Sequence, residues 1–250
     1  ARSETPAPVS IKHKLSLYGG VPPEAIALLP NADSIYQVPL SLEEQGIGAY
    51  LAKRLGFGAK KADMDSWQQL NTSIAKPRRQ AVSVGIVAKY LDNEDTYFSI
   101  AEALRAAAWH HEVGLEYSWV DAETIERTGT ANLAQYDGLL VPGGFGSRGV
   151  EGMVRAADYS LQNKVPYLGI CLGLQVAVIA AARRGGEVAA TSAELDPDTA
   201  CPVIYIMPDQ KGKEATGGTM RLGDYKAVLQ PRTRTAELYR SKTITERHRH

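Results

Sequence analysis

The chain has 250 residues, of which 44% are hydrophobic and 22% charged, and its 28 basic and 28 acidic residues give a formal net charge of zero. This composition indicates a globular protein with a sizeable core, and the lack of a basic surplus argues against nucleic acid as a partner. No apolar run reaches the roughly 20 residues of a membrane-spanning helix, so we expect no membrane partner. Two cysteines are too few for a disulfide framework and favour a cytoplasmic protein.

Residues 1–55 are predicted to be the end of a domain whose beginning is absent. The chain starts with Ala1 and has no signal peptide, so we expect it to begin inside a longer protein. Alternating apolar residues predict a short strand over residues 11–18. A capping-box pattern at Ser41 predicts a helix over residues 41–55. These elements contain too few strands to hold a core of their own.

Residues 56–80 are rich in Gly, Lys, Arg and Pro, and they predict a connector with a small helix over residues 65–70, docked through Trp67. From residue 81 onward, strands and helices alternate. Strands are predicted over residues 82–87, 115–120, 136–141 and 167–170, and helices over residues 95–110, 151–162 and 172–183. This order predicts an α/β fold with a mostly parallel sheet and right-handed crossovers.

The end of the chain is predicted to contain further strands. Apolar residues mark strands over residues 203–207 and 220–223, with a tight turn at residues 217–219 between them. The helix over residues 172–183 is apolar on nearly all sides, so we expect it to be buried on nearly all sides.

Cys171 follows a predicted buried strand and precedes a predicted helix, and it is flanked by Gly169 and Gly173. This pattern is typical of a nucleophile elbow, with cysteine in place of serine. The glycines allow a tight turn and a close approach of neighbouring backbones, and the start of the helix favours a thiolate. The alternative is a buried structural cysteine between two packing glycines.

A glycine-rich loop at residues 142–146 follows the strand over residues 136–141. Because the carboxyl ends of parallel strands meet at one edge of a sheet, we expect this loop to lie beside Cys171. Its backbone N–H groups, with that of Leu172, are suited to stabilise an oxyanion. The alternative is a phosphate-binding loop, but the Lys-Ser/Thr ending of a P-loop is missing.

Two stretches, residues 141–152 and 168–175, resemble class I glutamine amidotransferases, and within them the glutaminase domain of the CTP synthase family. Residues 34–39, 217–223 and 246–250 extend this resemblance. It implies an open, mostly parallel, flavodoxin-like sheet with helices on both faces. It also implies three parts: residues 1–55 as the C-terminal remnant of a synthetase (amidoligase) domain, residues 56–80 as a linker and residues 81–250 as the amidotransferase domain.

The resemblance implies that this domain releases ammonia from L-glutamine through a thioester on Cys171. The full synthetase of the family uses the ammonia, with ATP and Mg²⁺, to aminate UTP to CTP in pyrimidine biosynthesis. The implied oxyanion and glutamine-binding residues are Gly144, Leu172, Gly173, Leu174, Gln175 and Glu194. Without the resemblance, Glu194 would be interpreted as an acid in a loop.

Effector and nucleotide contacts are implied in the same way. The stretch that matches a GTP-activation region contains Phe145, Arg148, Gly149 and Glu151. From the residues alone, Arg148 and Glu151 would form a surface ion pair at a helix start. Arg2 and Lys14 match nucleotide-contacting positions. No cofactor or metal is expected in this domain, and the family implies a homo-tetramer.

The family continues beyond residues 246–250 to a His-Pro-Glu motif that completes its catalytic triad, and this motif is absent from the printed sequence. His110-His111-Glu112 precedes Cys171 and is expected to be a solvated helix end. We therefore expect a truncated amidotransferase domain that is incomplete alone. The alternatives are a catalytically dead module that regulates a synthetase, or the related cysteine-elbow fold of small proteases and stress proteins.

Overall fold

The computed structural model describes residues 1–58, 62–208 and 222–249. Contacts divide the chain into two compact units, and each is described here by itself. The first comprises Ala1–Gln80 and Ala106–Gly114, and the second comprises Ala81–Arg105 and Leu115–His250. None of the helices within the described ranges is long and apolar enough to cross a membrane.

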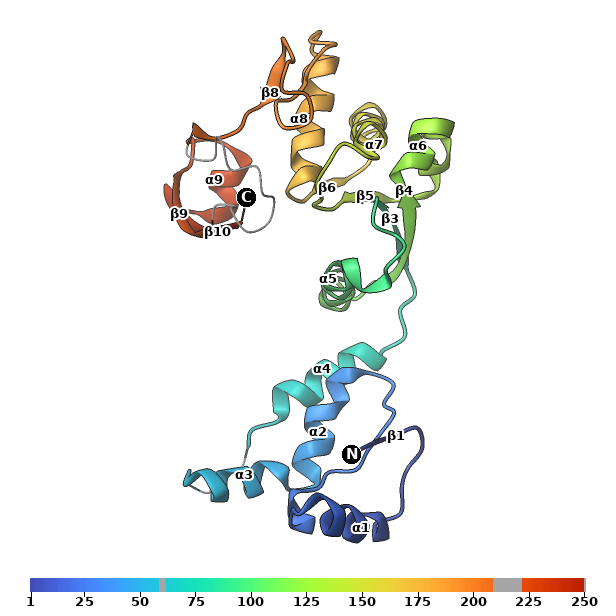
Figure 1. Ribbon diagram of the computed structural model, residues 1–250, viewed down its shortest axis with the longest axis vertical. Coiled ribbons are helices and arrows are strands. Elements are labelled where there is room, and N and C mark those ends of the chain that lie inside the picture. Colours follow the sequence, from blue (N-terminus) through green and yellow to red (C-terminus); the bar gives the residue numbers. More distant parts are fainter. Residues whose placement is uncertain (59–61, 209–221, 250) are drawn as a thin grey trace. The chain divides into compact units, whose positions relative to one another are not determined.

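The first unit is mainly helical (Figure 1). Its elements are β1 (Arg2–Ser3), α1 (Ser10–Gly19), η1 (Pro23–Ala25), β2 (Leu29–Pro30), η2 (Ile35–Gln37), α2 (Val38–Glu44), α3 (Ile47–Leu55) and α4 (Asp65–Ala75). The ring of Tyr36 contacts those of Trp67 and Trp109, at centroid distances of 6.4 and 5.3 Å. Trp67 therefore anchors α4, as expected from the sequence.

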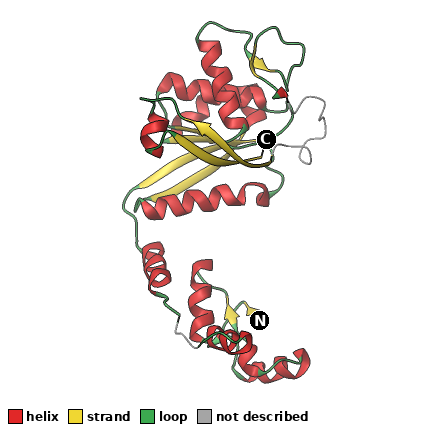
Figure 2. Ribbon diagram, turned by 90° about the vertical axis from the view of Figure 1, so that its left-hand side faces the viewer, coloured by secondary structure: helices red, strands yellow, loops and turns green. Residues whose placement is uncertain are grey.

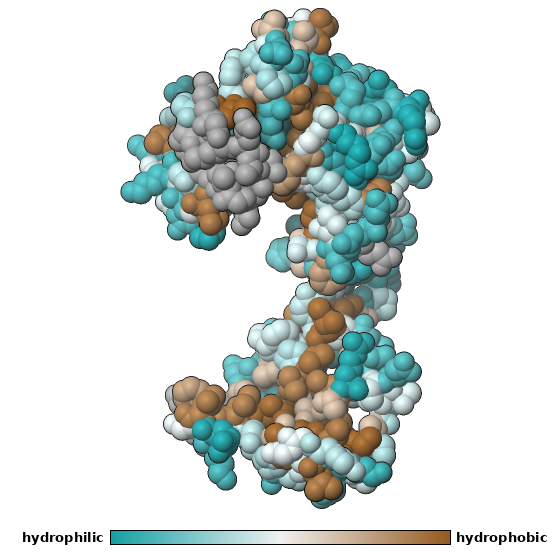
Figure 3. All heavy atoms as spheres, in the orientation of Figure 1, coloured by the Kyte–Doolittle hydropathy of each residue, from teal (hydrophilic) through white to brown (hydrophobic). Residues whose placement is uncertain are grey.

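The strand predicted over residues 11–18 is wrong, because these residues form α1. Ile11 and Leu15 lie four residues apart and share one helix face, each 36% exposed, whereas Leu17 and Tyr18 are 78% and 88% exposed. The same apolar residues satisfy both a period of two and a helical i, i+4 spacing. The helical choice leaves much apolar surface uncovered on this unit (Figure 3).

The single helix predicted over residues 41–55 is also wrong. Gly46 adopts φ +77° and separates α2 from α3. The helix α2 begins before Ser41, with a proline in its first turn, so Ser41 lies inside the helix and does not cap it. A glycine in the left-handed region ends a helix, and this local signal prevails over the apolar periodicity on either side.

The second unit contains a four-stranded sheet in the order β4-β3-β5-β6. These strands are β3 (Ala81–Ala88), β4 (Gly114–Asp121), β5 (Gly138–Val141) and β6 (Tyr167–Gly169). The pairs β3–β5 and β5–β6 are parallel. The helix α5 (Phe98–His110) lies on one face, and α7 (Val150–Asn163) and α8 (Leu172–Arg184) lie on the other (Figures 1 and 2). The predicted α/β fold class is confirmed.

The remaining elements of this unit are short. They are η3 (Glu94–Tyr97), α6 (Ala122–Thr128), η4 (Ala131–Gln135), β7 (Thr191–Ser192), β8 (Pro202–Ile204), β9 (Leu222–Val228), α9 (Arg234–Tyr239) and β10 (Thr243–Arg249). The strand predicted over residues 203–207 ends at Ile204, and the helix predicted from residue 95 starts with η3. The predicted turn at residues 217–219 and the start of the strand at 220–223 lie outside the described residues.

The helix α8 is not buried on nearly all sides, contrary to the prediction. Val176 and Ile179 are 0% and 1% exposed and belong to the main core cluster, whereas Leu174 and Val178 are 60% and 39% exposed. The helix packs one face against α7 and the sheet. The opposite face carries Leu174 and Val178, which the described residues leave exposed, so an apolar helix sequence does not by itself predict burial on all sides.

Asp121 caps the helix α6, which the sequence did not predict. Its carboxylate accepts hydrogen bonds from the backbone N–H of Glu123 and Thr124 and from the Thr124 hydroxyl. Partial burial acts to raise the pKa of this carboxyl, but the hydrogen bonds lower it by more, so the pKa lies below its ordinary value. The cap therefore binds best as the carboxylate.

Replacing Asp121 with Ala should lower the free energy of unfolding by about 1 kcal/mol near pH 7, because α6 loses its cap. A carboxyl whose folded pKa is depressed stabilises above its unfolded value of about 3.9 and loses that contribution as the pH falls through the folded pKa. Urea unfolding at several pH values measures this difference. Asp121→Asn, which caps without titrating, is the control. A wild-type advantage over Asp121→Ala that persisted unchanged in acid would contradict the assignment.

Candidate active site

The carboxyl ends of β3, β5 and β6 supply the candidate site. Lys89 follows β3, the glycine loop of residues 142–149 follows β5, and Cys171 follows β6. The chain runs from β3 to β4 on one side and then to β5 on the other, so the strand order reverses between β3 and β5. Ligands of open α/β sheets bind at such a switch point.

Cys171 lies in a strained turn between β6 and α8. Its φ and ψ are 55° and −108°, and it is the N-cap residue of α8. A Cβ atom on Gly169 would lie 2.5 Å from the carbonyl of Gly173, and one on Gly173 would lie 2.0 Å from the Val141 carbonyl oxygen. Neither position accepts a side chain, so the close backbone approach expected of the elbow is present.

The side chain of Tyr167 stabilises this turn through a hydrogen bond. Its hydroxyl donates a 2.7 Å hydrogen bond to the Gly173 carbonyl, which joins β6 to the first turn of α8. Burial raises the pKa of the Tyr167 hydroxyl, which keeps it protonated and able to donate. The Cys171 carbonyl accepts from the N–H groups of Leu174 and Gln175. The elbow is therefore held by hydrogen bonds on both sides of the thiol.

The glycine loop lies against the cysteine. A Cβ on Gly143 would be 3.3 Å from Cys171 Cβ and 3.8 Å from its Sγ, and one on Gly144 would be 3.4 Å from Leu172 Cδ2. The backbone N–H groups of Gly144 and Leu172 donate no hydrogen bond to a described residue. Unengaged donors beside a nucleophile are what an oxyanion hole requires. The structure thus brings Gly144 and Leu172 together, and their role remains a prediction.

Lys89 is the residue that sequence reasoning missed, although its position at the end of a buried strand was a signal. It is 2% exposed, and its Nζ donates to the Gly146 carbonyl at 2.7 Å. Burial, and then the nearby Arg148, lower the pKa of the Lys89 amine, while Glu194 and Glu126 act in the opposite direction. Glu194 itself is exposed.

The other predicted glutamine-binding residues lie in the first turn of α8. Leu172 and Gly173 are buried, Gln175 is half-buried, and Leu174 is 60% exposed. Since side chains of a helical turn point in different directions, Leu174 and Gln175 do not share one environment.

Arg148 and Glu151 do not pair with each other, so the ion pair suggested by the sequence alone is wrong. Arg148 Nη1 contacts Glu123 Oε1 at 2.7 Å, and Arg183 Nη1 contacts both carboxylate oxygens of Glu151, at 2.8 and 2.9 Å. Gly149 precedes α7 with φ +70°, so the chain turns sharply between the two residues. Phe145, in the same loop, is 46% exposed.

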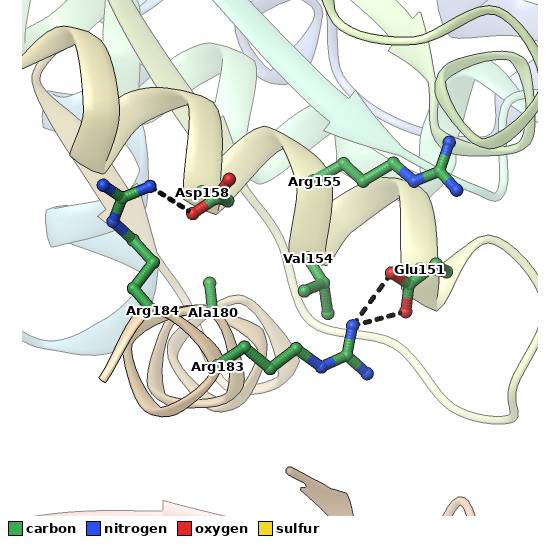
Figure 4. A pocket seen from close by; sticks show the side chains of 7 residues that line it. All are labelled: Glu151, Val154, Arg155, Asp158, Ala180, Arg183 and Arg184. Carbon is green, nitrogen blue, oxygen red and sulfur yellow. Dashed lines mark hydrogen bonds and ion pairs between the residues drawn. The ribbon is translucent and has the colours of Figure 1, made fainter. Parts of the chain in front are cut away.

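Glu151 lines a cavity of about 260 Å³ between α7 and α8 (Figure 4). Its other lining residues are Val154, Arg155, Asp158, Ala180, Arg183 and Arg184. The pairs Arg183–Glu151 and Arg184–Asp158 cross between the helices, as the dashed lines in Figure 4 show. Arg183 is twelve residues from Cys171 along α8, or about 18 Å at 1.5 Å per residue. The cavity is therefore an ion-paired groove between helices, apart from the candidate nucleophile.

Arg2 and Lys14 belong to the first unit. Arg2 donates two hydrogen bonds to Asn31 Oδ1, at 3.2 and 3.1 Å, and Lys14 is exposed. At the end of α5, His111 and Glu112 are exposed, and Glu112 pairs with Lys76 at 2.8 Å, as expected for a solvated helix end. Across the described ranges, no group of three or more His, Cys, Asp or Glu is arranged to hold a metal ion.

Comparison with known proteins gives the class to which this elbow and sheet belong. Residues 91–250 match the family model described as glutamine amidotransferase class-I. The match covers more than half of the chain, and the chain belongs to the class I glutamine amidotransferase family.

Within this class, the chain is similar to CTP synthases over its whole length. It is 46% identical to the CTP synthase of Roseiflexus sp. (strain RS-1), covering 100% of this chain and 45% of that protein. It is 41% identical to the CTP synthase of Thermococcus kodakarensis, a match that covers 100% of this chain and 47% of that protein. A structure described as Trypanosoma brucei CTPS glutaminase domain with bound acivicin matches at 35% identity and TM-score 0.60, covering 68% of this chain and 66% of that chain. The predicted resemblance is confirmed, and the chain spans about half the length of these curated relatives.

Replacing Gly173 with Ala should lower the free energy of unfolding by about 3 kcal/mol or more, because overpacking against a backbone carbonyl forces α8 away from β5. The control is Gly138→Ala, where the new Cβ would meet Pro166 O at an ordinary 3.6 Å. The control should stay within about 1 kcal/mol of the wild type. Urea unfolding measures both, and equal losses would contradict the close approach at the elbow.

Proposed function

We propose that this chain is the glutaminase half of a CTP synthase, with Cys171 as its nucleophile. One observation carries the proposal: a strained cysteine occupies the N-cap position of α8, and the nearby N–H groups of Gly144 and Leu172 donate no hydrogen bond to a described residue. Strained backbone is costly, and it persists where the structure imposes it, often at active sites. This geometry favours an enzyme over a catalytically dead module, which would have no use for a strained cysteine.

The proposed reaction begins with attack of the Cys171 thiolate on the carboxamide carbon of L-glutamine. The carboxamide oxygen becomes negatively charged, and the N–H groups of Gly144 and Leu172 stabilise it. The C–N bond then breaks, the nitrogen takes up a proton and leaves as ammonia, and a glutamyl thioester remains. Water hydrolyses the thioester to glutamate and restores the thiol. The proton-transferring histidine implied by the family is absent from the printed residues, so the assignment covers the nucleophile and the oxyanion donors.

The glutamine head group is assigned to Gln175 and Glu194, with Gly173 and Leu174 contributing backbone. A carboxylate such as Glu194 suits the α-ammonium group, since a charge-assisted hydrogen bond is stronger than a neutral one.

The wider activity rests on the similarity to CTP synthases. In this proposal the ammonia aminates UTP to CTP with ATP and Mg²⁺, in a cytoplasmic homo-tetramer. In this proposal, ATP and Mg²⁺ bind the part of CTP synthases that this chain does not match, since the chain covers 45% of the Roseiflexus relative. Residues 1–55 are assigned to the end of that synthetase domain, residues 56–80 to the linker and residues 81–250 to the amidotransferase domain. Arg2 and Lys14 would contact nucleotide.

Activation by GTP is assigned to the loop region of Phe145, Arg148, Gly149 and Glu151. The exposed ring of Phe145 and the guanidinium of Arg148 offer stacking and charge to a nucleotide. Glu151 is already engaged by Arg183, so it would act through that ion pair.

Labelling with a chloroketone analogue of glutamine tests the nucleophile. The wild type should be labelled at Cys171, and Cys171→Ala should lose the label. Cys201→Ala is the matched control and should label as the wild type does. Lost hydration and the Glu187 carboxylate raise the pKa of the Cys201 thiol, which disfavours its thiolate. Peptide mass spectrometry locates the label, and a label on Cys201 in place of Cys171 would refute the assignment.

A further inference from the structure

Four hydrogen bonds join the segment of residues 145–148 to Lys89 and Tyr90, the two residues that follow β3. From these contacts we infer that Lys89 and Tyr90 are positioning residues, which hold residues 143–146 in the conformation that presents the Gly144 N–H to the reacting carbonyl. This inference rests on the proposed glutaminase function and deepens it. It gives Lys89 and Tyr90 a positioning role in the proposed active site, a role that the sequence analysis did not predict.

The hydroxyl of Tyr90 binds both backbone polar groups of Phe145, its N–H and its carbonyl. It donates to the Phe145 carbonyl and accepts from the Phe145 N–H, each at 3.0 Å. The Phe145 side chain is 46% exposed and gives the loop little anchorage of its own. Since Phe145 directly follows Gly144, fixing the Phe145 peptide also restricts rotation of the Gly144 backbone.

Lys89 holds the next residue of the loop. Its amine donates to the Gly146 carbonyl at 2.7 Å, and the side chain is buried. Gly146 itself has φ +72° and no neighbouring atom within 4 Å of a Cβ position, so the loop has no packing there. A buried amine with a carbonyl partner therefore supplies the restraint that packing does not.

Arg148 completes the connection in the opposite direction. Its Nη2 donates to the Lys89 carbonyl at 2.8 Å while Nη1 pairs with Glu123. Lys89 Nζ and Arg148 Cζ lie 5.7 and 6.0 Å from the centroid of the Tyr90 ring. The ring of Tyr90 is thus held by two cations, and its hydroxyl is aimed at the loop.

We call Lys89 and Tyr90, with the hydrogen bonds that they make to residues 145–148, the clamp. Gly144 lies between this clamp and the turn at Cys171. A Cβ there would be 2.9 Å from Lys89 Cε, 3.4 Å from a carbon of the Tyr90 ring and 3.4 Å from Leu172 Cδ2. The clamp therefore contacts the residue whose N–H is the proposed oxyanion donor, and Leu172 flanks it on the other side. Removing the clamp's hydrogen bonds should therefore weaken stabilisation of the oxyanion in the transition state more than it weakens binding of the unreacted substrate.

The test compares two reagents on the 250-residue chain. The thiolate adds to the carbonyl of a glutamine chloroketone and develops an oxyanion; the sulfur then displaces chloride from the adjacent CH₂ carbon, which leaves a thioether and restores the ketone. Iodoacetamide alkylates the same thiol by direct displacement of iodide and needs no oxyanion donor. Tyr90→Phe removes the gripping hydroxyl and keeps the ring. Tyr159→Phe is the matched control, because Tyr159 packs against the core and its hydroxyl has no hydrogen bond to a described residue. Lys89→Met is the second variant.

Tyr90→Phe and Lys89→Met should each slow chloroketone labelling of Cys171 by about tenfold at saturating reagent, since they loosen an oxyanion donor without removing it. In both variants, the chloroketone concentration that gives half-maximal labelling and the rate of alkylation by iodoacetamide should stay within about twofold of the wild type. The Tyr159→Phe control should stay within about twofold of the wild type for both reagents. Chloroketone labelling at the wild-type rate in both variants would overturn the clamp and leave the glutaminase proposal intact. Equal slowing with both reagents would also overturn it, because it would show a general disturbance of Cys171. A wild type that reacts with iodoacetamide and not with the chloroketone would refute the assignment of Cys171 and the N–H groups of Gly144 and Leu172 as a glutamine-reactive site, and the inference about Lys89 and Tyr90 with it.

Discussion

The contact between the first turn of α8 and the end of β5 is the constraint on which the site depends. The backbone of Gly173 approaches Val141 so closely that a Cβ would lie 2.0 Å from its carbonyl oxygen. The chain between β6 and α8 therefore turns tightly, and Cys171 adopts a strained backbone conformation with φ 55°. The thiol is thereby fixed at the carboxyl edge of the sheet, at the start of a helix, where the dipole favours negative charge.

The opposite wall of the site depends on polar contacts and not on packing. The loop after β5 consists largely of glycine and has few side chains with which to fill space. Its position is held from β3, by a buried lysine and a tyrosine hydroxyl that bind its backbone. A rigid, packed elbow therefore faces a loop held by hydrogen bonds. Such a loop is the part of the site that a neighbouring residue or an effector can adjust with the least disturbance of the core.

The sequence predicted the parallel sheet, the elbow and the loop, because each has a local signature. Apolar strands alternate with helices after residue 81, and Gly169 and Gly173 flank Cys171 at the spacing that a tight turn requires. Since parallel strands end at one edge, the meeting of Gly143 with Cys171 followed from topology alone. The resemblance to CTP synthases rested on the same stretches, and the comparisons confirm it.

The rest depended on tertiary contacts that no short stretch reveals. Ile11 and Leu15 fit both a strand and a helix, and the helix forms without burying either residue. The sequence of α8 is apolar on nearly all sides and was expected to be buried, but its exposed face carries the apolar residues Leu174 and Val178. Lys89 and Arg148 are 59 residues apart, and their hydrogen bond exists only because β3 and β5 are neighbours. Side chains that position a site from a distance in sequence have no signature of their own.

A crystal structure of the chain with the glutamine chloroketone bound to Cys171 tests the central claim most directly. The account predicts a thioether bond at Sγ, formed with loss of chloride, and a ketone oxygen within about 3 Å of the N–H groups of Gly144 and Leu172. An adduct whose oxygen faces away from both donors would contradict it, since the loop and the elbow would then not form one oxyanion site.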